Sequence, residues 1–501
     1  MNGIEAITIT AEVNVSGGNN YSIVGLPDSA VRESYKRIDT ALKNMGLHMP
    51  RRGILVNLAP ADIRKEGSSY DLCIAAGILA ASGQMEGAEL HRYLIMGELS
   101  LDGGLQPVRG VLPIAVQARK EGFKGFILPK QNVREAAIVA DLEVYGASNL
   151  MEVYRFFNGE GGMERVRVNT REDFFNRINN YEQDFSDVKG QENVKRSLEI
   201  AAAGGHNIIL IGPPGAGKTM LAKRLPTILP PLTLHEALET TKIHSVAGKL
   251  AAGALLTVRP FRSPHHTISD VALVGGGGSP QPGEISLAHN GVLFLDELPE
   301  FRRTVLEVLR QPLEERQVSI ARARFSVKYP ASFMLVASMN PCPCGYYNHP
   351  AKECVCPPGM VQKYLNRISG PLLDRIDIHV EVTPVAFSEL AGSRASEKSD
   401  CVRERVIAAR EAQRRRFGDR RGIYSNSQIP AKDVREICRI DQAGQELLKA
   451  AMERLGLSAR AYDRILKVAR TVADLAGSKG IRVEHLAEAI HYRSLDRESW
   501  G

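Results

Sequence analysis

Residues 208–219 read Ile208-Ile209-Leu210-Ile211 and then Gly212-Pro213-Pro214-Gly215-Ala216-Gly217-Lys218-Thr219, an apolar run followed by a glycine-rich turn. A helical pattern opens directly afterwards at Met220. This order predicts a buried strand, a loop and a helix, because glycines let successive backbone N–H groups curl around an anion and the helix N-terminus adds its positive dipole end. In this spacing Lys218 would reach the phosphates of a nucleotide, and the Thr219 hydroxyl would hold Mg²⁺. The alternative is an ordinary glycine-rich turn.

Length and composition limit the classes to which the protein can belong. The chain has 501 residues, 44% of them hydrophobic and 24% charged, and a prior of roughly 150 residues per domain suggests three domains. Residues 72–81 form the longest weakly polar stretch, which is too short to span a bilayer, and the N-terminus lacks a signal-peptide pattern. We therefore expect a cytoplasmic protein with no membrane partner. The net charge of +7 does not by itself indicate nucleic acid.

Two adjacent acids follow a second apolar run, Gly291-Val292-Leu293-Phe294-Leu295-Asp296-Glu297. Carboxylates at the tip of a buried strand are costly unless they serve a cation or a water molecule. Downstream of a phosphate loop, we expect Asp296 to hold Mg²⁺ through its water shell and Glu297 to act as the base that polarises the attacking water. The alternative is an Asp-Glu pair that caps a helix.

The first 160 residues alternate strand-like and helical segments without a phosphate loop, which predicts an α+β domain. Strands are expected at 7–15, 21–27, 52–60 and 125–129, and helices at 31–42 and 112–121. Residues 97–129 resemble the proteolytic domain of Lon proteases, and in that resemblance Ser69 matches the nucleophilic serine. The activating lysine should lie within Leu112-Pro113-Ile114, which is uncharged. Since a serine without its base is a weak nucleophile, we interpret Ser69 as structural and the domain as non-catalytic.

Segments beyond the two acids resemble AAA ATPases. Asn340 ends the apolar run Phe333-Met334-Leu335-Val336-Ala337-Ser338-Met339, like the sensor asparagine that contacts the γ-phosphate or its attacking water. Arg375 stands where these ATPases present an arginine finger to a neighbouring subunit, which implies a homo-oligomeric ring, a hexamer. Arg460 resembles the second sensor, which reaches back to the γ-phosphate. The alternatives are a strand-end turn at Asn340, an exposed ion pair of Arg375 with Asp374 or Asp377, and a surface position for Arg460.

Four of the seven cysteines fall within fifteen positions, as Cys342-Pro343-Cys344 and Cys354-Val355-Cys356, which argues against an extracellular disulfide framework. Four thiolates in a short loop rich in proline and glycine can close a tetrahedral Zn²⁺ site. The CxC spacing is tighter than the usual CxxC, so four unliganded thiols remain the alternative. Such a site would brace the loop and do no chemistry.

Two inserts interrupt the nucleotide-binding core. The first contains Arg262-Ser263-Pro264-His265-His266-Thr267 and a glycine tract at 275–278, and the second, residues 316–327, alternates like a β-hairpin. With the run from Pro282 to Glu297, these inserts resemble the helix-2-insert clade of AAA ATPases. The whole chain resembles the Mg-chelatase-like ATPases of the ComM (YifB) competence type.

This resemblance implies an α/β multidomain fold that uses ATP and Mg²⁺. Its parts are a non-proteolytic, Lon-like α+β domain (1–160), a linker (161–185), an AAA+ P-loop NTPase core of the helix-2-insert clade (186–395) and a C-terminal α-helical lid (396–501). The segment from Asp400 carries many arginines, which could form a basic surface or only a solvated helix face.

The expected activity is that of a ring motor acting on DNA. Arg322, Arg324 and Lys328 lie on the second insert, where ring helicases project a basic finger into the central channel. They would contact single-stranded or branched DNA in a helicase or branch-migration factor of recombination or natural transformation. In the alternative, these cations pair with acids within the ring, and the motor is of a chelatase or protein-remodelling type.

Overall fold

The computed structural model describes residues 3–178, 181–250, 255–277, 280–322, 325–347, 349, 352–385, 396–418, 420 and 422–493. The chain divides into two compact units: Met1–Arg177 with Leu234–Leu256, and Ile178–Thr233 with Thr257–Gly501. In the described part of the chain, no helix is both long and apolar enough to cross a membrane.

The second unit is built on a parallel sheet with the strand order β11-β14-β17-β10-β18. Its strands are β10 (Ile208–Ile211), β11 (Phe261–Arg262), β14 (Val292–Leu295), β17 (Met334–Met339) and β18 (Ile378–Glu381). Every residue of β10, β14 and β17 is buried, as expected for parallel strands that are covered on both faces. The strand predicted before the glycine-rich turn is confirmed with its bounds, and β17 lies within the predicted run 333–340.

Strand order decides what meets at each edge of this sheet. Because the strands are parallel, the segments that follow β10, β14 and β17 all leave at the carboxyl edge. The phosphate loop, the two adjacent acids and Asn340 follow these three strands and therefore gather at one edge. The segment that ends at Asp377 precedes β18 and therefore lies at the opposite, amino edge.

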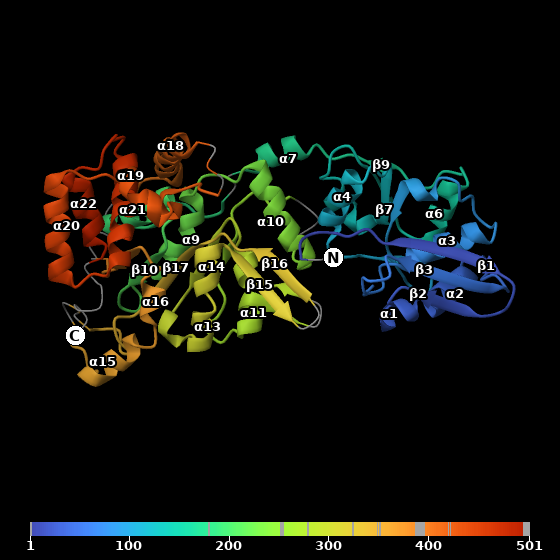
Figure 1. Ribbon diagram of the computed structural model, residues 1–501, viewed down its shortest axis with the longest axis horizontal. Coiled ribbons are helices and arrows are strands. Elements are labelled where there is room, and N and C mark those ends of the chain that lie inside the picture. Colours follow the sequence, from blue (N-terminus) through green and yellow to red (C-terminus); the bar gives the residue numbers. More distant parts are fainter. Residues whose placement is uncertain are drawn as a thin grey trace. The chain divides into compact units, whose positions relative to one another are not determined.

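Helices cover this sheet and extend into the C-terminal part (Figure 1). The helices beside the phosphate loop are α8 (Glu192–Gly204) and α9 (Lys218–Ile228). The C-terminal helices α18–α22 lie side by side in Figure 1. They are α18 (Ser399–Phe417), α19 (Ala431–Ile437), α20 (Gln442–Leu455), α21 (Ala459–Leu475) and α22 (Val483–His491). Leu198, Ile208, Val406, Ile465 and Leu486 belong to one buried cluster, so these helices share a core with the sheet.

Short elements fill the two inserts and the segments around them. The second insert is an antiparallel hairpin of β15 (Gln317–Arg322) and β16 (Phe325–Pro330), as predicted. The others are β12 (Gly275–Gly276), β13 (Gln281–Pro282), α11 (Asp270–Val274), α12 (Glu284–Leu287), α13 (Arg303–Glu307), α14 (Arg310–Glu315), α15 (Pro358–Leu365) and α16 (Gly370–Leu373).

The first unit is an α+β fold, as predicted. One mixed sheet has the order β1-β3-β2 and a second has the order β4-β7-β8-β9, beside a β5-β6 hairpin. Its strands are β1 (Thr10–Ser16), β2 (Tyr21–Val24), β3 (Gly53–Ala59), β4 (Tyr93–Ile95), β5 (Glu98–Leu99), β6 (Leu105–Gln106), β7 (Gly125–Pro129), β8 (Glu143–Ala147) and β9 (Arg165–Val166). Its helices are α1 (Ser29–Arg32), α2 (Ser34–Asn44), α3 (Asp71–Ala81), α4 (Val111–Lys120), α5 (Val133–Ala136), α6 (Leu150–Phe157), α7 (Thr170–Arg177) and α10 (Leu234–Val246).

The predicted helix at 31–42 is two helices. The Asp28 carboxylate accepts a hydrogen bond from the Val31 backbone N–H at 2.8 Å and caps α1, which ends at Arg32 before α2 starts at Ser34. The helical period continues across the break, so the hydrophobic pattern could not reveal it.

One helix of the first unit comes from far along the chain. In α10, the Ser245 hydroxyl donates to the buried Glu135 carboxylate at 2.5 Å, and the Ser245 carbonyl accepts from the Gly110 N–H at 3.2 Å. Leu238 and Leu255 pack against the apolar cluster around α4. Chain order alone did not indicate that residues 234–256 join this unit.

Candidate nucleotide-binding and metal sites

The loop after β10 has the shape that a phosphate chain requires. Gly215 and Gly217 have φ of +79° and +85°, a region that glycine enters without steric cost, and no atom would obstruct a side chain there within 4 Å. Gly212 is tightly packed, because a methyl group at this position would overlap the Val382 carbonyl oxygen. The open concave turn is followed at once by the N-terminus of α9, an eleven-residue helix.

Lys218 lies across this loop. Its Nζ donates to the carbonyls of Gly212 and Pro213 at 2.8 and 2.9 Å, and to the side-chain oxygen of Asn340 at 3.1 Å. Burial lowers the pKa of Lys218, while the charges of Asp296 and Glu297 act in the opposite direction. Asn340 therefore contacts the lysine of the phosphate loop, although 122 positions separate the two residues.

Oxygen ligands for a divalent cation meet beside the lysine. The Thr219 hydroxyl donates to Asp296 Oδ2 at 2.8 Å, and the hydroxyl of Ser338 on β17 bonds the other oxygen of the same carboxylate. Hydroxyl and carboxylate oxygens are the ligands that Mg²⁺ prefers, so Thr219 and Asp296 fit this ion. Glu297 follows with φ +55°, a left-handed conformation that is uncommon outside glycine.

Gln191 connects the loop to the segment that precedes α8. Its side-chain amide donates to the carbonyls of Ala216 and Thr383 at 2.9 and 3.0 Å. The nearby Asp187 carboxylate pairs with Arg224 on α9 at 2.9 Å. These contacts place the segment beside the phosphate loop, where a nucleotide base could bind.

The two candidate arginines lie away from this loop. Arg375 and Asp377 come just before β18, and the Asp377 N–H donates to the carbonyl of Asn207, which precedes β10, at 3.0 Å. Arg460 lies 3.9 Å from the Asp374 carboxylate. Both arginines are therefore at the amino edge of the sheet, opposite to the phosphate loop of the same chain.

Arg375 is not exposed, contrary to the alternative of a surface ion pair with Asp374 or Asp377. It is 7% exposed and bonds the Glu314 carboxylate and the Pro371 carbonyl. Its Nε has no hydrogen-bond partner among the described residues. Asp377 instead pairs with Arg464 and with His206, whose Nδ1 lies 3.0 Å from a carboxylate oxygen. Arg464 and His206 together hold the pKa of the buried Asp377 well below its usual range, against the effect of burial.

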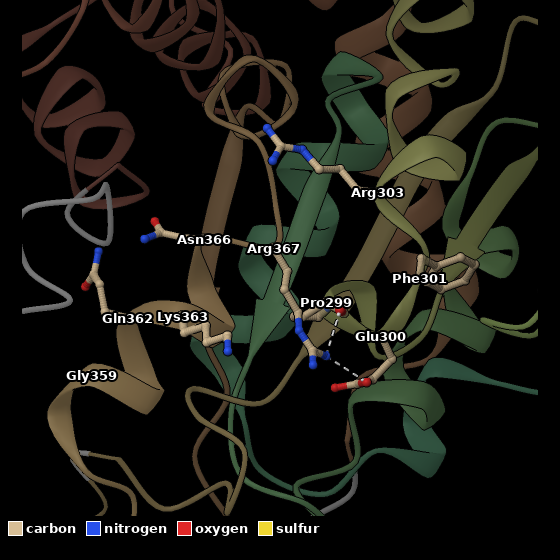
Figure 2. A pocket seen from close by; sticks show the side chains of 9 residues that line it. All are labelled: Pro299, Glu300, Phe301, Arg303, Gly359, Gln362, Lys363, Asn366 and Arg367. Carbon is tan, nitrogen blue, oxygen red and sulfur yellow. Dashed lines mark hydrogen bonds and ion pairs between the residues drawn. The ribbon is translucent and has the colours of Figure 1, made fainter.

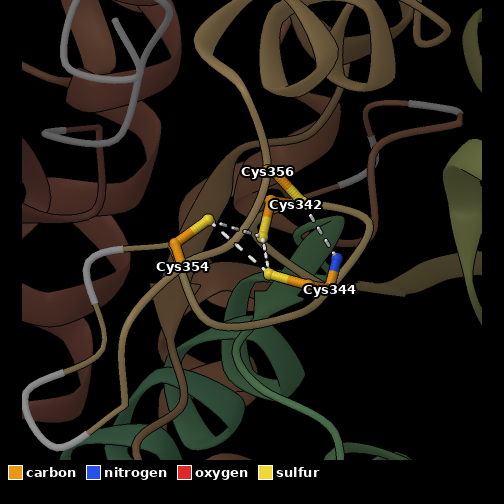
Figure 3. Close-up of side chains that lie close together, drawn as sticks. All are labelled: Cys342, Cys344, Cys354 and Cys356. Atoms are coloured by element: carbon orange, nitrogen blue, oxygen red, sulfur yellow. Dashed lines mark hydrogen bonds between the residues drawn. The ribbon is translucent and has the colours of Figure 1, made fainter.

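The four clustered cysteines converge (Figure 3). Their Sγ atoms all lie within 4.8 Å of one another, and three pairs are 3.3, 3.6 and 3.7 Å apart. A tetrahedral zinc site with Zn–S bonds of about 2.3 Å requires sulfur atoms about 3.8 Å apart. The donor set therefore fits Zn²⁺. Gly345, next to Cys344, has φ +85° and packs against Pro214 of the phosphate loop.

The predicted DNA contacts are only partly within the described residues. Arg322 ends β15 opposite Phe325, and Lys328 is exposed on β16 opposite Ser319. Arg324 lies outside the described residues. The hairpin is braced at its base by the Tyr329 hydroxyl, which donates to the Pro280 carbonyl at 2.8 Å.

Several arginines of helix α18 bond other helices and do not form only a solvated face. Arg403 donates to the Thr227 carbonyl at 2.8 Å, Arg405 pairs with Glu199 at 2.5 Å and Arg410 donates to the Ala202 carbonyl at 2.9 Å. These bonds tie α18 to α8 and α9. Arg414 and Arg415 remain exposed.

A cavity of about 870 Å³ opens between residues 299–303, which follow Glu297, and α15 (Figure 2). Arg367 donates to the Pro299 carbonyl at 3.3 Å and pairs with Glu300 at 2.9 Å. Lys363 and Arg303 also line it. None of its lining residues belongs to the phosphate loop.

Around Ser69, the neighbouring Ser68 hydroxyl bonds Glu98, and the buried Lys65 ammonium bonds the Pro60 carbonyl. Leu112 is fully buried in α4, within the segment where the resemblance requires a base. The structural role of Ser69 stays a prediction.

Sequence reasoning missed three contacts of this site. Ser338 bonds Asp296, Glu314 pairs with Arg375, and His266 Nδ1 lies 3.8 Å from a Glu297 carboxylate oxygen. The two adjacent histidines of the first insert could have indicated a functional contact from the sequence. Ser338 and Glu314 could not, since a serine in a strand and a glutamate on a helix are common in any protein.

Comparison with known proteins agrees with this geometry. Residues 184–390 match the family model described as "Magnesium chelatase, subunit ChlI", residues 11–132 match "Subunit ChlI of Mg-chelatase", and residues 396–493 match "Magnesium chelatase, subunit ChlI C-terminal". These three matches assign the chain, with its parallel α/β sheet and phosphate loop, to the magnesium-chelatase class of proteins.

Two relatives match along their whole length. The chain is 44% identical over 498 residues to "Competence protein ComM" of Haemophilus influenzae, covering 99% of this chain and 96% of that protein. It is 44% identical over 499 residues to "Uncharacterized protein YifB" of Escherichia coli, with the same coverage. The chain belongs to the ComM/YifB family of Mg-chelatase-like AAA+ proteins. This family membership suggests ATPase activity with ATP and Mg²⁺, and AAA+ proteins commonly form oligomers.

A third relative matches only in part. "Lon protease 2" of Bacillus subtilis is 33% identical over an alignment of 157 residues, and the match covers 28% of this chain and 27% of that protein. This partial match confirms the resemblance to Lon proteases that the sequence indicated.

Proposed function

We propose that this chain is an ATP-hydrolysing ring motor of the Mg-chelatase-like AAA+ family that acts on DNA. The observation that carries the ATPase part is the convergence of Lys218, Thr219, Asp296, Glu297 and Asn340 at one edge of the sheet. When bound, Mg²⁺ supplies positive charge that offsets the charge developing on the transferred phosphoryl group. Thr219 and Asp296 would hold this ion, and the backbone of residues 212–219 would bind the phosphates.

In this proposal the Glu297 carboxylate is the catalytic base, and Asn340 is a second residue that acts at the same site. Glu297 follows the end of β14, and its backbone N–H is held 3.2 Å from Asp296 Oδ1 and 3.3 Å from the Ser338 hydroxyl. Asn340, already bonded to Lys218, can accept or donate at the γ-phosphate or its attacking water.

Replacing Glu297 tests the chemistry. Glu297→Gln should bind ATP with little change and hydrolyse it roughly 10²- to 10⁴-fold more slowly, since that is the usual contribution of a positioned base. Glu300→Gln is the matched control, because Glu300 is a carboxylate three positions away that pairs with Arg367 on the surface. Turnover by Glu297→Gln at the wild-type rate would remove Glu297 from this role.

DNA is proposed as the substrate because the relative with 44% identity bears the name "Competence protein ComM" and because the hairpin carries Arg322, Arg324 and Lys328. Copies of such a hairpin around a ring would present several cations to phosphates, and binding would weaken steeply as salt rises. The alternatives, a chelatase-type or a protein-remodelling motor, take support from the family description and from the Lon-like domain.

The deciding experiment compares single-stranded, duplex and forked DNA as stimulators of ATP hydrolysis, together with strand displacement and three-strand branch migration. The Arg322→Ala/Arg324→Ala variant should lose DNA binding and branch migration together while nucleotide binding survives. The matched control is Arg414→Ala/Arg415→Ala, which removes the same charge from the exposed face of α18. No DNA binding at low salt by the assembled, ATP-bound protein would reject DNA as the substrate.

A further inference from the structure

The paired histidines of the first insert meet the carboxylate proposed as the catalytic base. His266 Nδ1 lies 3.8 Å from Glu297 Oε2, and the two side chains are 32% and 56% exposed. No other ion pair to the Glu297 carboxylate occurs within the described residues. Thirty-one positions separate the two residues, so this contact is made by the fold.

The fold holds His266 in place from three sides. β11 pairs with β14 in parallel register, with Arg262 opposite Leu293, so the residues after both strands leave at the same edge. Arg262 also forms a bidentate ion pair with Glu284 at 2.5 and 2.8 Å, which anchors β11 to α12. The His266 ring lies against the His265 ring at a tilt of 34° with centroids 4.1 Å apart, and it makes a T-shaped contact with the buried Phe301 ring at 6.4 Å.

His265 is in turn fixed by the backbone. Its Nδ1 lies 2.9 Å from the Thr267 hydroxyl and accepts from the Thr267 N–H at 3.4 Å, and its carbonyl accepts from the Ile268 N–H at 3.0 Å. The His265 ring is therefore held in one orientation, and it limits the rotation of the neighbouring His266 ring.

Glu297 is the opposite case, because its backbone is fixed while its side chain is not. Its φ of +55° costs free energy in a residue other than glycine, and such strain occurs mostly where the position of a side chain matters. Its N–H is held by Asp296 and Ser338. The carboxylate needs a second restraint to face an attacking water molecule, and His266 is the group in contact with it.

We propose that His266 is a positioning residue for Glu297, whose imidazole holds the carboxylate in the orientation that polarises the attacking water. The inference rests on the proposed ATPase function. The imidazole limits the positions open to the carboxylate through their contact at 3.8 Å.

Other charged groups near this contact are Asp296, Lys218, His265 and Tyr364. The charges of Asp296 and Glu297 both act on Lys218. Burial, then Glu300, and further Glu297, raise the pKa of Tyr364, so this phenol stays neutral at physiological pH. His265 has its Nδ1 engaged by Thr267. His266 is thus the ring that lies directly beside the carboxylate.

The test compares kcat and KM of ATP hydrolysis by the full-length protein with Mg²⁺. His266→Ala should lower kcat roughly ten- to a hundredfold, since small misplacements of a catalytic group have effects of that size. The KM for ATP should stay within about twofold, because the phosphate loop does not contact His266.

Two further variants separate positioning from packing. His266→Gln keeps a hydrogen-bond donor at this position, so it should recover part of the lost kcat. His266→Phe keeps a ring for packing without a donor, so its kcat should stay as low as that of His266→Ala.

The outcomes distinguish this inference from the proposed function. A wild type that does not hydrolyse ATP would overturn the proposed function and the inference with it. A wild type that hydrolyses ATP, with His266→Ala showing the same kcat, would overturn only the role of His266. A large rise in KM with kcat unchanged would also overturn it, because His266 would then support the nucleotide site by packing alone.

Discussion

Gly345→Ala is predicted to weaken ATP binding, although Gly345 belongs to the cysteine loop. At φ +85°, a non-glycine residue costs about 1–2 kcal/mol. A methyl group there would also overlap the Cδ of Pro214 and lie 3.2 Å from its Cγ. Carbon atoms pack at about 3.5–4.0 Å, so Pro214 would have to move on the order of 1 Å.

Pro214 lies inside the loop that would bind the phosphates, so this displacement acts on the nucleotide directly. A loss of about 1.4 kcal/mol in the free energy of binding corresponds to a tenfold larger dissociation constant. We expect at least this change in a titration of the protein with a fluorescent ATP analogue and Mg²⁺. The metal content of the variant, measured in parallel, separates an effect of the contact from a loss of the cysteine site.

Gly359→Ala is the matched control, since Gly359 is also near the cysteines and has no atom within 4 Å of an added methyl group. It should bind the analogue as the wild type does. Unchanged affinity of Gly345→Ala, with unchanged metal content, would refute the argument that the cysteine loop braces the phosphate loop.

The remaining predictions concern metal, acid stability and action between subunits. Purified protein should contain about one zinc ion per chain, lost when Cys342 and Cys344 become serine; metal-free wild type with full activity would favour the free-thiol alternative. Burial and the neighbouring arginine lower the pKa of His379 to about 3, so this ring stays neutral in the folded state while the unfolded chain takes up a proton below about pH 6.5. The free energy of unfolding should therefore fall by about 2 kcal/mol between pH 7 and 5, and His379→Gln should remove this part of the pH dependence in denaturant titrations; an identical slope in the variant contradicts it. Arg375→Ala should lose ATPase activity by roughly 10³-fold or more and recover part of it when mixed with Lys218→Ala, whereas one chain carrying both changes should not complement; failure at every mixing ratio argues against action in trans.

Local chemistry made much of this protein predictable. The phosphate loop can be recognised from consecutive residues, because its glycines, its lysine and the following helix act within a few positions of one another. The strand at 208–211 is confirmed with its bounds, and the helix predicted directly after the loop is α9, Lys218–Ile228. The cysteines were recognisable for the same reason, since each CxC pair places two sulfur atoms on one short loop.

The order of the strands decided the rest. Because β11 lies next to β14, His266 reaches Glu297, and because β18 runs parallel to β10, Arg375 and Arg460 lie at the edge opposite the phosphate loop. Residues 234–256 join the first unit because Ser245 satisfies the buried Glu135. Such contacts depend on which surfaces pack together over long separations in the chain, and hydrophobic period and turn chemistry carry no information about them. The sequence by itself therefore determined the reactive groups and the strands that present them, while the tertiary structure alone determined which groups face one another.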